Sequence, residues 1–138
     1  PSMVARNNGK ILNTSSTAAL IPGPLQAVYF ASKAYVSSFS NALAEELHDK
    51  NITVTALLPG ATQTGFAKIS GVDKTAIFSN PASARSVAED GYNAMIKGKL
   101  DIVSVSSRSQ KIQLSLVPLF PKKMILKTTR QMQEEKNG

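Results

Sequence analysis

Cysteine is absent from the 138-residue sequence, and His48 is its only histidine. Disulfide bridges and thiolate metal sites are therefore excluded, and a catalytic triad or zinc site built on histidine has little to draw on. No apolar run approaches the length needed to span a bilayer. The remaining composition, 42% hydrophobic and 18% charged residues, is typical of one globular domain with a real core.

Acidic residues are also few, nine against sixteen lysines and arginines, which gives a formal charge of +7. Much of this charge lies near the end of the sequence, where two glutamates face seven basic residues: Arg108, Lys111, Lys122, Lys123, Lys127, Arg130 and Lys136. Such a basic tail can contact phosphates or an anionic membrane surface. A solvated helix face is the favoured interpretation, and we expect no nucleic-acid partner.

The sequence opens with "PSMVARNNGK", without an initiator methionine, and its first clear element is already a buried strand. We therefore expect residues 1–138 to be the C-terminal portion of a longer protein and to form a single, incomplete domain. A strand cut off from its neighbours would leave one edge of "KILNTS" unpaired, which is an aggregation hazard.

Apolar, β-branched runs alternate with helical patterns along the chain. The sequence predicts strands at 9–16, 51–59 and 101–106, helices at 29–49 and 84–97, loops at 17–28 and 60–82, and C-terminal helical pieces interrupted at Pro118 and Pro121. A connection as long as 60–82 is usually a functional lid or partly helical. The alternation predicts an α/β fold, a doubly wound parallel sheet with helices on both faces.

Local signals mark the two longer helices. In the first, Phe39, Leu43 and Leu47 recur at four-residue spacing. In the second, Ser83 is the expected N-cap. The expected core positions of the second helix are Val87, Met95 and Ile96. His48 follows the first helix, where a partial positive charge complements the helix dipole, and we expect no catalytic role for it.

Polar groups from distant parts of the sequence are expected at one rim of this sheet. Ser15 and Ser16 end the first strand, Pro59-Gly60 ends the second, and the helix carrying Tyr29 and Lys33 begins at the same edge. A phenol ionises well above neutral pH, so a proton-transferring tyrosine needs positive charge nearby, which a lysine one helical turn away supplies. With a serine hydroxyl, this set can polarise a carbonyl group and protonate the alkoxide that hydride addition forms.

Three motifs together resemble the short-chain dehydrogenase/reductase family: "ILNTSS", Tyr29-Phe-Ala-Ser-Lys33, and "LLPGATQT". The interval of 13 residues between Ser16 and Tyr29 also matches the family pattern. The resemblance implies a Rossmann-type fold, NAD or NADP as cofactor, and hydride transfer to or from a small-molecule carbonyl or secondary alcohol. It further implies a homodimer or homotetramer, a cytoplasmic location and no metal.

Roles for individual residues follow from the same resemblance. Tyr29 corresponds to the catalytic acid and base, and Ser16 to the hydroxyl that orients the substrate. Lys33 corresponds to the cation that holds the ribose hydroxyls and favours the ionised phenol. The remaining cofactor contacts correspond to Pro59 and Gly60 beside the nicotinamide, and to Thr62 and Thr64 near its carboxamide or a neighbouring phosphate.

Three elements of the family pattern are missing from the sequence, one of them the asparagine that completes the family's proton relay. The glycines of the sequence form no Gly-rich turn of the kind that binds the cofactor pyrophosphate, and the residue that selects NAD or NADP is also missing. We therefore expect this piece alone to bind cofactor poorly.

Other interpretations stay open at this stage. Tyr29 and Lys33 could be surface residues, Ser15 and Ser16 strand-end caps, and Thr62 and Thr64 turn residues. The fold could also serve a scaffold that has lost turnover, or a membrane or nucleic-acid partner recruited by the basic tail.

The first helix also carries a row of small residues. In the family this helix commonly meets its symmetry mate across a two-fold axis, so we expect Ala31, Ser38 and Ala42 near a subunit contact.

Overall fold

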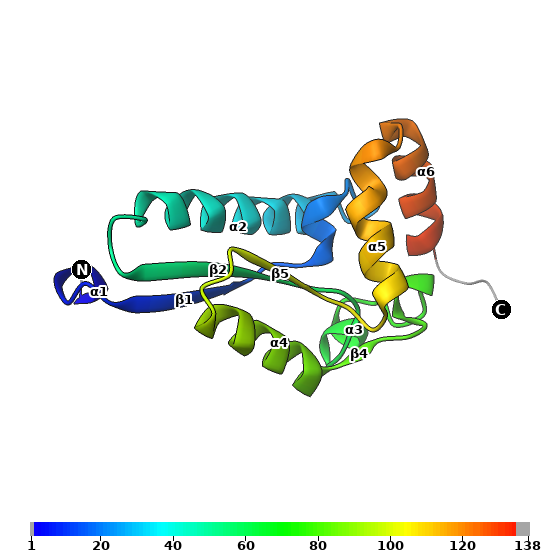
Figure 1. Cartoon of the computed structure of the whole chain (residues 1–138). Helices are drawn as coiled ribbons and strands as arrows, with labels where there is room; N and C mark the ends of the chain where they lie inside the picture. Colours follow the sequence, from blue (N-terminus) through cyan, green and yellow to red (C-terminus); the bar gives the residue numbers. More distant parts are fainter. Residues whose placement is uncertain (1, 135–138) are drawn as a thin grey trace.

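Three parallel strands form the main sheet of the protein, shown in the computed structural model, which describes residues 2–134 (Figure 1). The strands are β1 (Gly9–Thr14), β2 (Ile52–Pro59) and β5 (Asp101–Ser104), in the order β1-β2-β5. Gly9 pairs with Ile52 and Thr14 with Leu57, while Ala56 pairs with Asp101. The predicted parallel sheet is confirmed, although the first and third strands each end two residues earlier than expected.

The central strand β2 is the most deeply buried part of the sheet. Its buried apolar residues are Ile52, Val54, Ala56, Leu57 and Leu58. A strand with a neighbour on each edge and helices on both faces needs such a continuous apolar run. The carboxyl end of β2 is thereby fixed beside the end of β1, where the candidate site lies.

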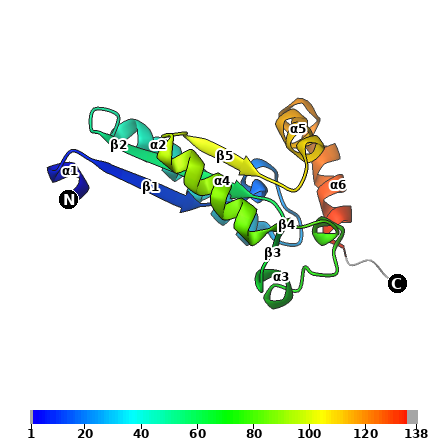
Figure 2. The ribbon, with the colours of Figure 1, turned by 60° about the horizontal axis from the view of Figure 1, so that its bottom comes forward.

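Helix α2 (Ala27–Glu46) covers one face of the sheet, and helix α4 (Ala84–Ile96) covers the other (Figures 1 and 2). The predicted cap of α4 is confirmed, because Ser83 Oγ accepts a hydrogen bond from the Ser86 amide at 3.1 Å. Gly91 lets α4 approach the sheet closely, since a Cβ there would lie 2.8 Å from Leu57 Cδ2.

The core of this layer consists of Leu57, Ala82 and Val87, with Leu12 and Ile102 packed against them. The prediction for Val87 is confirmed, and Met95 is half-buried. The prediction for Ile96 is wrong: its side chain is 46% exposed. It lies on the face of α4 opposite Ala94, which is buried against the sheet.

Helix α2 begins two residues before the predicted start and ends earlier than expected. Phe30 and Ser40 are its buried residues, and Ser40 Oγ accepts a hydrogen bond from Asn13 Nδ2 at 3.0 Å, which ties the helix to β1. Phe39 is 48% exposed, because at 100° per residue it lies on the opposite side of the helix from Phe30.

The connection 60–82 after β2 was predicted to be a functional lid or partly helical. The structure shows that it is partly helical. It contains β3 (Thr62–Gln63), α3 (Phe66–Ile69), the 3-10 turn η2 (Ala76–Phe78) and β4 (Ala82–Ser83). Strands β3 and β4 pair in a second, two-stranded sheet. The connection thus returns across the carboxyl ends of β1 and β2.

The shorter elements complete the chain. Helix α1 (Ser2–Ala5) precedes β1, and the 3-10 turn η1 (Thr17–Leu20) follows it. The C-terminal elements are α5 (Arg108–Leu116), the 3-10 turn η3 (Val117–Leu119) and α6 (Lys122–Gln133). The predicted interruptions are confirmed, since Pro118 lies in η3 and Pro121 is the N-cap residue of α6.

Strand β1 has β2 as its neighbour on one edge, and no described residue pairs with its other edge. Lys10 and Thr14 are exposed and the other four residues are half-buried, so Lys10 is the one charged residue that protects this strand. The expected unpaired edge is therefore present in the part of the chain described here. Within the same part, no helix combines the length and apolar character that crossing a membrane requires.

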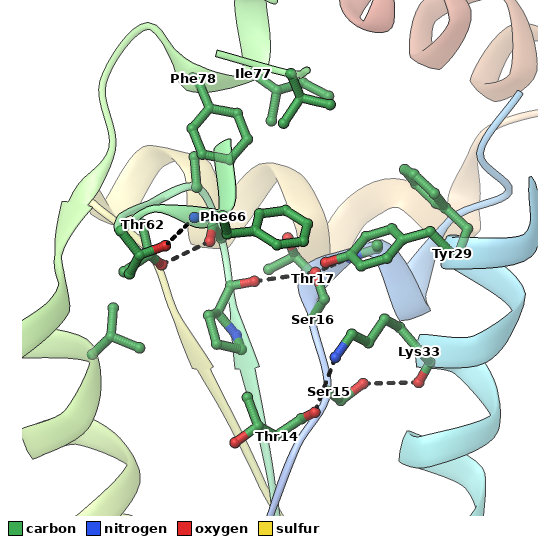
Figure 3. A pocket seen from close by; sticks show the side chains of 18 of the residues that line it. Thr14, Ser15, Ser16, Thr17, Tyr29, Lys33, Thr62, Phe66, Ile77 and Phe78 are labelled. Atoms are coloured by element: carbon green, nitrogen blue, oxygen red, sulfur yellow. Dashed lines mark hydrogen bonds between the residues drawn. The ribbon is translucent and has the colours of Figure 1, made fainter. Parts of the chain in front are cut away.

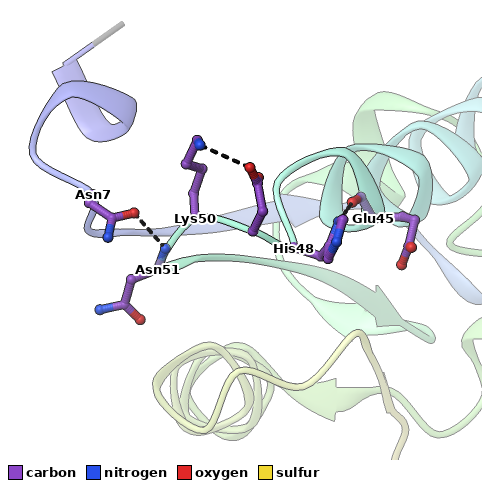
Figure 4. A network of polar contacts seen from close by, with 6 residues as sticks. Asn7, Glu45, His48, Lys50 and Asn51 are labelled. Carbon is purple, nitrogen blue, oxygen red and sulfur yellow. Dashed lines mark hydrogen bonds and ion pairs between the residues drawn. The ribbon is translucent and has the colours of Figure 1, made fainter.

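His48 lies where α2 ends, at the amino ends of the strands (Figure 4). Its Nδ1 is 2.8 Å from the Glu45 carbonyl oxygen in the last turn of α2, which also accepts the His48 amide at 3.2 Å. Close by, a hydrogen bond from Lys50 lowers the pKa of Asp49, and Asn7 Oδ1 accepts the Asn51 amide at 3.0 Å. These contacts fix the turn between α2 and β2.

Candidate active site

A cavity of about 490 Å³ opens at the carboxyl ends of β1 and β2, between α2 and the 60–82 connection (Figure 3). All seven predicted site residues contribute to its wall: Ser16, Tyr29, Lys33, Pro59, Gly60, Thr62 and Thr64. They come from three separate segments, at residues 16, 29–33 and 59–64, that only the fold brings together. The predicted convergence at one rim of the sheet is therefore present, and the role of each residue stays a prediction.

Tyr29 extends from the first turn of α2 into this cavity, on the side where β1 ends (Figure 3). Its ring is half-buried, 5.9 Å from the Phe30 ring in an edge-on arrangement and 5.7 Å from the Phe66 ring. Phe30 is itself held by Gly23, where an added Cβ would lie 2.1 Å from the Phe30 ring. The loop before α2 therefore fixes the helix turn that presents the phenol.

Lys33 lies one turn further along α2, on the same face as Tyr29. Its ammonium donates a hydrogen bond to the Thr14 carbonyl at 3.2 Å and lies 5.8 Å from the centre of the Tyr29 ring. No carboxylate of residues 2–134 forms an ion pair with it. The ammonium therefore lies beside the phenol ring with no carboxylate partner among the described residues.

The two serines after β1 have different surroundings. Ser15 is buried, and its hydroxyl donates to the Lys33 carbonyl at 2.8 Å and lies 2.8 Å from Ser37 Oγ. Ser16 is half-buried, with its hydroxyl 3.4 Å from the Pro59 carbonyl, a long hydrogen bond, while it accepts the Ala18 amide at 3.1 Å. Ser15 therefore locks α2 onto β1, and Ser16 is the serine able to serve a ligand.

Pro59 and Gly60 end β2 at the back of the cavity. The Gly60 amide donates to the Ser104 carbonyl at 2.8 Å, and a Cβ at this position would lie 2.9 Å from Val105 Cγ1. Glycine thus permits the close approach of this turn to the end of β5.

Thr62 and Thr64 both make local turn contacts, as the more conservative interpretation expected. The Thr62 hydroxyl donates to the Gly60 carbonyl at 2.9 Å, and Thr64 Oγ1 accepts the Phe66 amide at 3.3 Å. The Thr62 proton is used in its contact, whereas the Thr64 hydroxyl keeps its proton for another acceptor. Of the two, Thr64 is the better placed to donate to a ligand.

Several residues of the cavity were missed by the sequence motifs. They form an apolar wall that includes Phe66, Val72, Ile77, Phe78, Leu114 and Met132. Both predicted loops, 17–28 and 60–82, contribute residues to the cavity wall. The contribution of α5 and α6 had no motif to indicate it, because it depends on how the C-terminal helices fold back over the rim.

The arrangement joins a phenol, an ammonium and a hydroxyl at one end of an otherwise apolar cavity. These groups can stabilise and protonate an oxygen on which negative charge develops. Among the described residues there is no group of three or more histidine, aspartate or glutamate side chains that could hold a metal ion. The chemistry that the phenol, the ammonium and the hydroxyl offer is proton transfer and polarisation of an oxygen.

Known proteins match this chain along its first half. The family model described as short chain dehydrogenase matches residues 1–75. The rat (Rattus norvegicus) very-long-chain 3-oxoacyl-CoA reductase is 48% identical over 69 residues, which is 50% of this chain and 22% of that protein. The human (Homo sapiens) 17-beta-hydroxysteroid dehydrogenase type 3 is 47% identical over 66 residues, 48% of this chain and 21% of that protein. The matched region thus spans about a fifth of the length of these relatives.

Solved structures share the fold over more of the chain. A 7beta-hydroxysteroid dehydrogenase matches with a TM-score of 0.72 and 16% identity, over 93% of this chain and 48% of that one. A short-chain dehydrogenase from Sphingobium yanoikuyae matches with a TM-score of 0.68 and 24% identity, over 86% of this chain and 47% of that one. The family model covers more than half of the chain, including the serine, tyrosine and lysine positions, so the chain belongs to the short-chain dehydrogenase family.

Proposed function

We propose that the protein is an oxidoreductase that transfers hydride between a nicotinamide cofactor and a carbonyl compound or secondary alcohol. The observation that carries this proposal is the meeting of Ser16, Tyr29 and Lys33 at one end of the cavity. A scaffold protein would have no need to keep an ammonium against a phenol beside an open hydroxyl.

In the reductive direction Tyr29 gives its proton to the oxygen of the substrate. Ser16 donates a hydrogen bond to the same oxygen and holds it in line with the phenol. Lys33 stabilises the negative charge left on Tyr29, since its ammonium is retained at the ring and has no carboxylate partner among the described residues. The reverse order of proton transfers serves alcohol oxidation.

The residues at the cavity fit the nicotinamide end of a cofactor, which when bound supplies or accepts the hydride. Lys33 offers an ammonium suited to ribose hydroxyls and Thr64 offers a hydroxyl, while Pro59 and Gly60 line the cavity beside them. The similar dehydrogenase from Sphingobium yanoikuyae is a complex with NADPH, and one from Mycobacterium paratuberculosis is bound to NAD. We accordingly propose NAD or NADP as the cofactor.

The apolar wall favours a substrate whose reacting group is attached to a large hydrocarbon body. The side chains of Ile77, Phe78 and Leu114 offer such a body a dry surface, while the polar groups gather at Tyr29. The names of two relatives, a very-long-chain 3-oxoacyl-CoA reductase and a hydroxysteroid dehydrogenase, describe substrates of this kind. We propose a lipophilic ketone or secondary alcohol.

Cofactor binding tests this proposal before any substrate is known. The intact protein is expected to enhance or shift the fluorescence of NADPH or NADH on titration, because the bound nicotinamide leaves water for the cavity. A titration of the denatured protein serves as the blank. A native protein that leaves the fluorescence of both cofactors unchanged would favour the scaffold interpretation and refute an oxidoreductase.

A homodimer or homotetramer formed through α2 is a further part of the proposal. The three small residues predicted at the contact, Ala31, Ser38 and Ala42, are all exposed. Beside them, Tyr35 and Phe39 stack with ring centres 6.0 Å apart and are 68% and 48% exposed. This mixture of small and aromatic side chains suits a packed helix contact. The cytoplasmic location expected from the family resemblance stays a prediction.

Ser38→Trp is expected to shift the intact protein toward the monomer. A tryptophan at this position would separate two helices that approach each other across small residues. Light scattering after size-exclusion chromatography measures the mass, and Asn93→Trp, on the exposed face of α4, is the matched control. The contact would be misassigned if Ser38→Trp kept the native mass, or if the native protein were already monomeric.

A further inference from the structure

The last two helices form a hairpin whose turn carries exposed apolar side chains. We define the elbow surface as Ile112, Leu116, Leu119 and Phe120, which are 61%, 43%, 78% and 47% exposed. Ile112 and Leu116 share one face of α5, one turn apart, and Leu119 and Phe120 follow directly in the turn to α6. In both ribbon views this turn lies at the end of the hairpin away from the main sheet (Figures 1 and 2).

Local chemistry explains why the turn projects. Pro118 cannot continue the hydrogen bonding of α5, so the chain passes into the 3-10 turn η3. Pro121 then starts α6, where its missing N–H costs nothing. The face of α6 that contains Ile125 and Thr129 packs toward the protein, with η2 as a neighbour. The elbow surface is left outside this contact.

Basic residues flank the elbow surface on both helices. Between residues 102 and 133 the sequence has no aspartate or glutamate, and its basic residues are Arg108, Lys111, Lys122, Lys123, Lys127 and Arg130. All six are exposed. Lys123, Lys127 and Arg130 lie at four- and three-residue intervals and so share one face of α6. Arg130 forms an exposed ion pair with Glu134 at 3.1 Å, and the other five have no ion-pair partner among residues 2–134.

The charge distinguishes this surface from the exposed apolar face of α2. That face, with Tyr35 and Phe39, belongs to a helix whose charged residues are Lys33, Glu45 and Glu46. It has no basic border and suits another protein surface. Apolar side chains bordered by lysine and arginine instead match a bilayer with anionic headgroups, which accepts both parts at once.

We propose that the elbow surface docks on an anionic phospholipid bilayer. Leu119 and Phe120 enter the headgroup region, and the basic residues of α5 and α6 contact the lipid phosphates. Neither helix crosses the bilayer; the hairpin rests on it. The sequence alone favoured a solvated basic tail over a membrane contact. The exposed apolar side chains of the elbow surface are the structural observation that favours the membrane contact.

Docking at the elbow also has a consequence for the cavity. Gln110 and Leu114 of α5, with Met132 and Gln133 of α6, line its wall. The hairpin that touches the bilayer therefore also forms one side of the cavity. Resting on the proposed function, one hairpin then contacts both the phase that dissolves a lipophilic substrate and the cavity that binds it.

Vesicle flotation tests the docking independently of any catalysis. The intact protein is incubated with vesicles of phosphatidylcholine alone or of phosphatidylcholine with one quarter phosphatidylserine. We expect binding to the anionic vesicles, a decrease with rising salt, and little binding to the neutral ones. Because each basic residue near an anionic surface strengthens binding about fivefold, Lys122→Glu with Lys123→Glu should weaken it by at least about twentyfold.

Matched variants distinguish vesicle binding through the elbow surface from nonspecific vesicle binding. Leu119→Asp is expected to weaken vesicle binding at least about tenfold, since it places a charge at the point of insertion. Ile69→Asp, at an 89% exposed position of α3, and Lys97→Glu with Lys99→Glu, exposed beyond α4, should bind like the native protein. Circular dichroism confirms that each variant is folded.

Three results would overturn the proposal. The first is equal binding to neutral and anionic vesicles. The second is unchanged binding of the elbow variants, or equal losses in the control variants. The third is a lower mass of Leu119→Asp in solution, which would show that a second copy covers the elbow.

Tight binding of a short DNA duplex that Leu119→Asp leaves intact, without vesicle binding, would assign the charge to a nucleic acid instead. Vesicle binding without NAD(P)H binding would leave docking standing and refute the oxidoreductase.

Discussion

Tyr29→Phe is expected to reduce turnover of the intact enzyme by about a hundredfold to ten-thousandfold, the range for loss of a positioned proton donor. The substitution removes one oxygen and keeps the ring. The contacts of that ring with Phe30 and Phe66, at 5.9 and 5.7 Å between centres, should therefore survive. The dissociation constant of NADPH or NADH, measured by fluorescence, should change little, so that the loss appears in kcat.

Tyr35→Phe provides the matched control for this experiment. Tyr35 lies on the same helix but is 68% exposed on its outer face, and it does not line the cavity. Its variant should keep native turnover. If Tyr29→Phe also turned over within a few-fold of the native rate, the phenol would not be the proton donor. If its fluorescence titration failed instead, Tyr29 would act chiefly in cofactor binding.

The sequence was sufficient to predict the sheet because β2 is buried along most of its length. A run such as "ITVTALLP" has no stable position except between two strands and two helix layers, so its place in a parallel sheet follows from its composition. The rim followed as well, because Ser16 lies just after β1 and Pro59 ends the neighbouring parallel strand. Their side-by-side position is fixed once the pairing of Thr14 with Leu57 is set.

The faces of the helices were harder to predict. Phe39 is part of a correct helical periodicity, yet the buried face is set by Phe30 and Ser40, and Phe39 points away from it. Ile96 has the same difficulty at the end of α4, where Ala94 and Gly91 face the sheet. In both helices the large apolar residues predicted one buried face, whereas the structure buries a face that contains small residues. A helix approaches a sheet most closely over small side chains.

The cavity wall formed by α5 and α6 was beyond local patterns altogether. Leu114 and Met132 meet in the cavity only because the turn at Pro118 and Pro121 folds one helix back beside the other. Neither residue belongs to a motif. The periodicity of apolar residues in α5 and α6 alone does not distinguish a helix that lines a cavity from one that faces solvent. Long-range placement of this kind depends on the whole fold, and sequence spacing carries no information about it.

Lys33→Met is expected to weaken NADPH or NADH binding by about tenfold to a hundredfold, the loss of one charged hydrogen-bonding group at about 1.5–3 kcal/mol. Methionine keeps an unbranched stem and removes the ammonium that donates to the Thr14 carbonyl at 3.2 Å and lies 5.8 Å from the centre of the Tyr29 ring. Turnover at saturating cofactor should fall as well, because no other described cation contacts the Tyr29 ring to stabilise its charge.

Lys33→Arg should not restore either property, since a planar guanidinium cannot occupy the position of a compact ammonium at Thr14. Lys68→Ala, which removes an exposed lysine of α3 that does not line the cavity, is the control and should bind cofactor like the native protein. Fluorescence titration gives the dissociation constants and steady-state kinetics gives kcat. Native affinity and native kcat in Lys33→Met would make Lys33 a surface residue and remove the electrostatic basis of the proposed proton transfer.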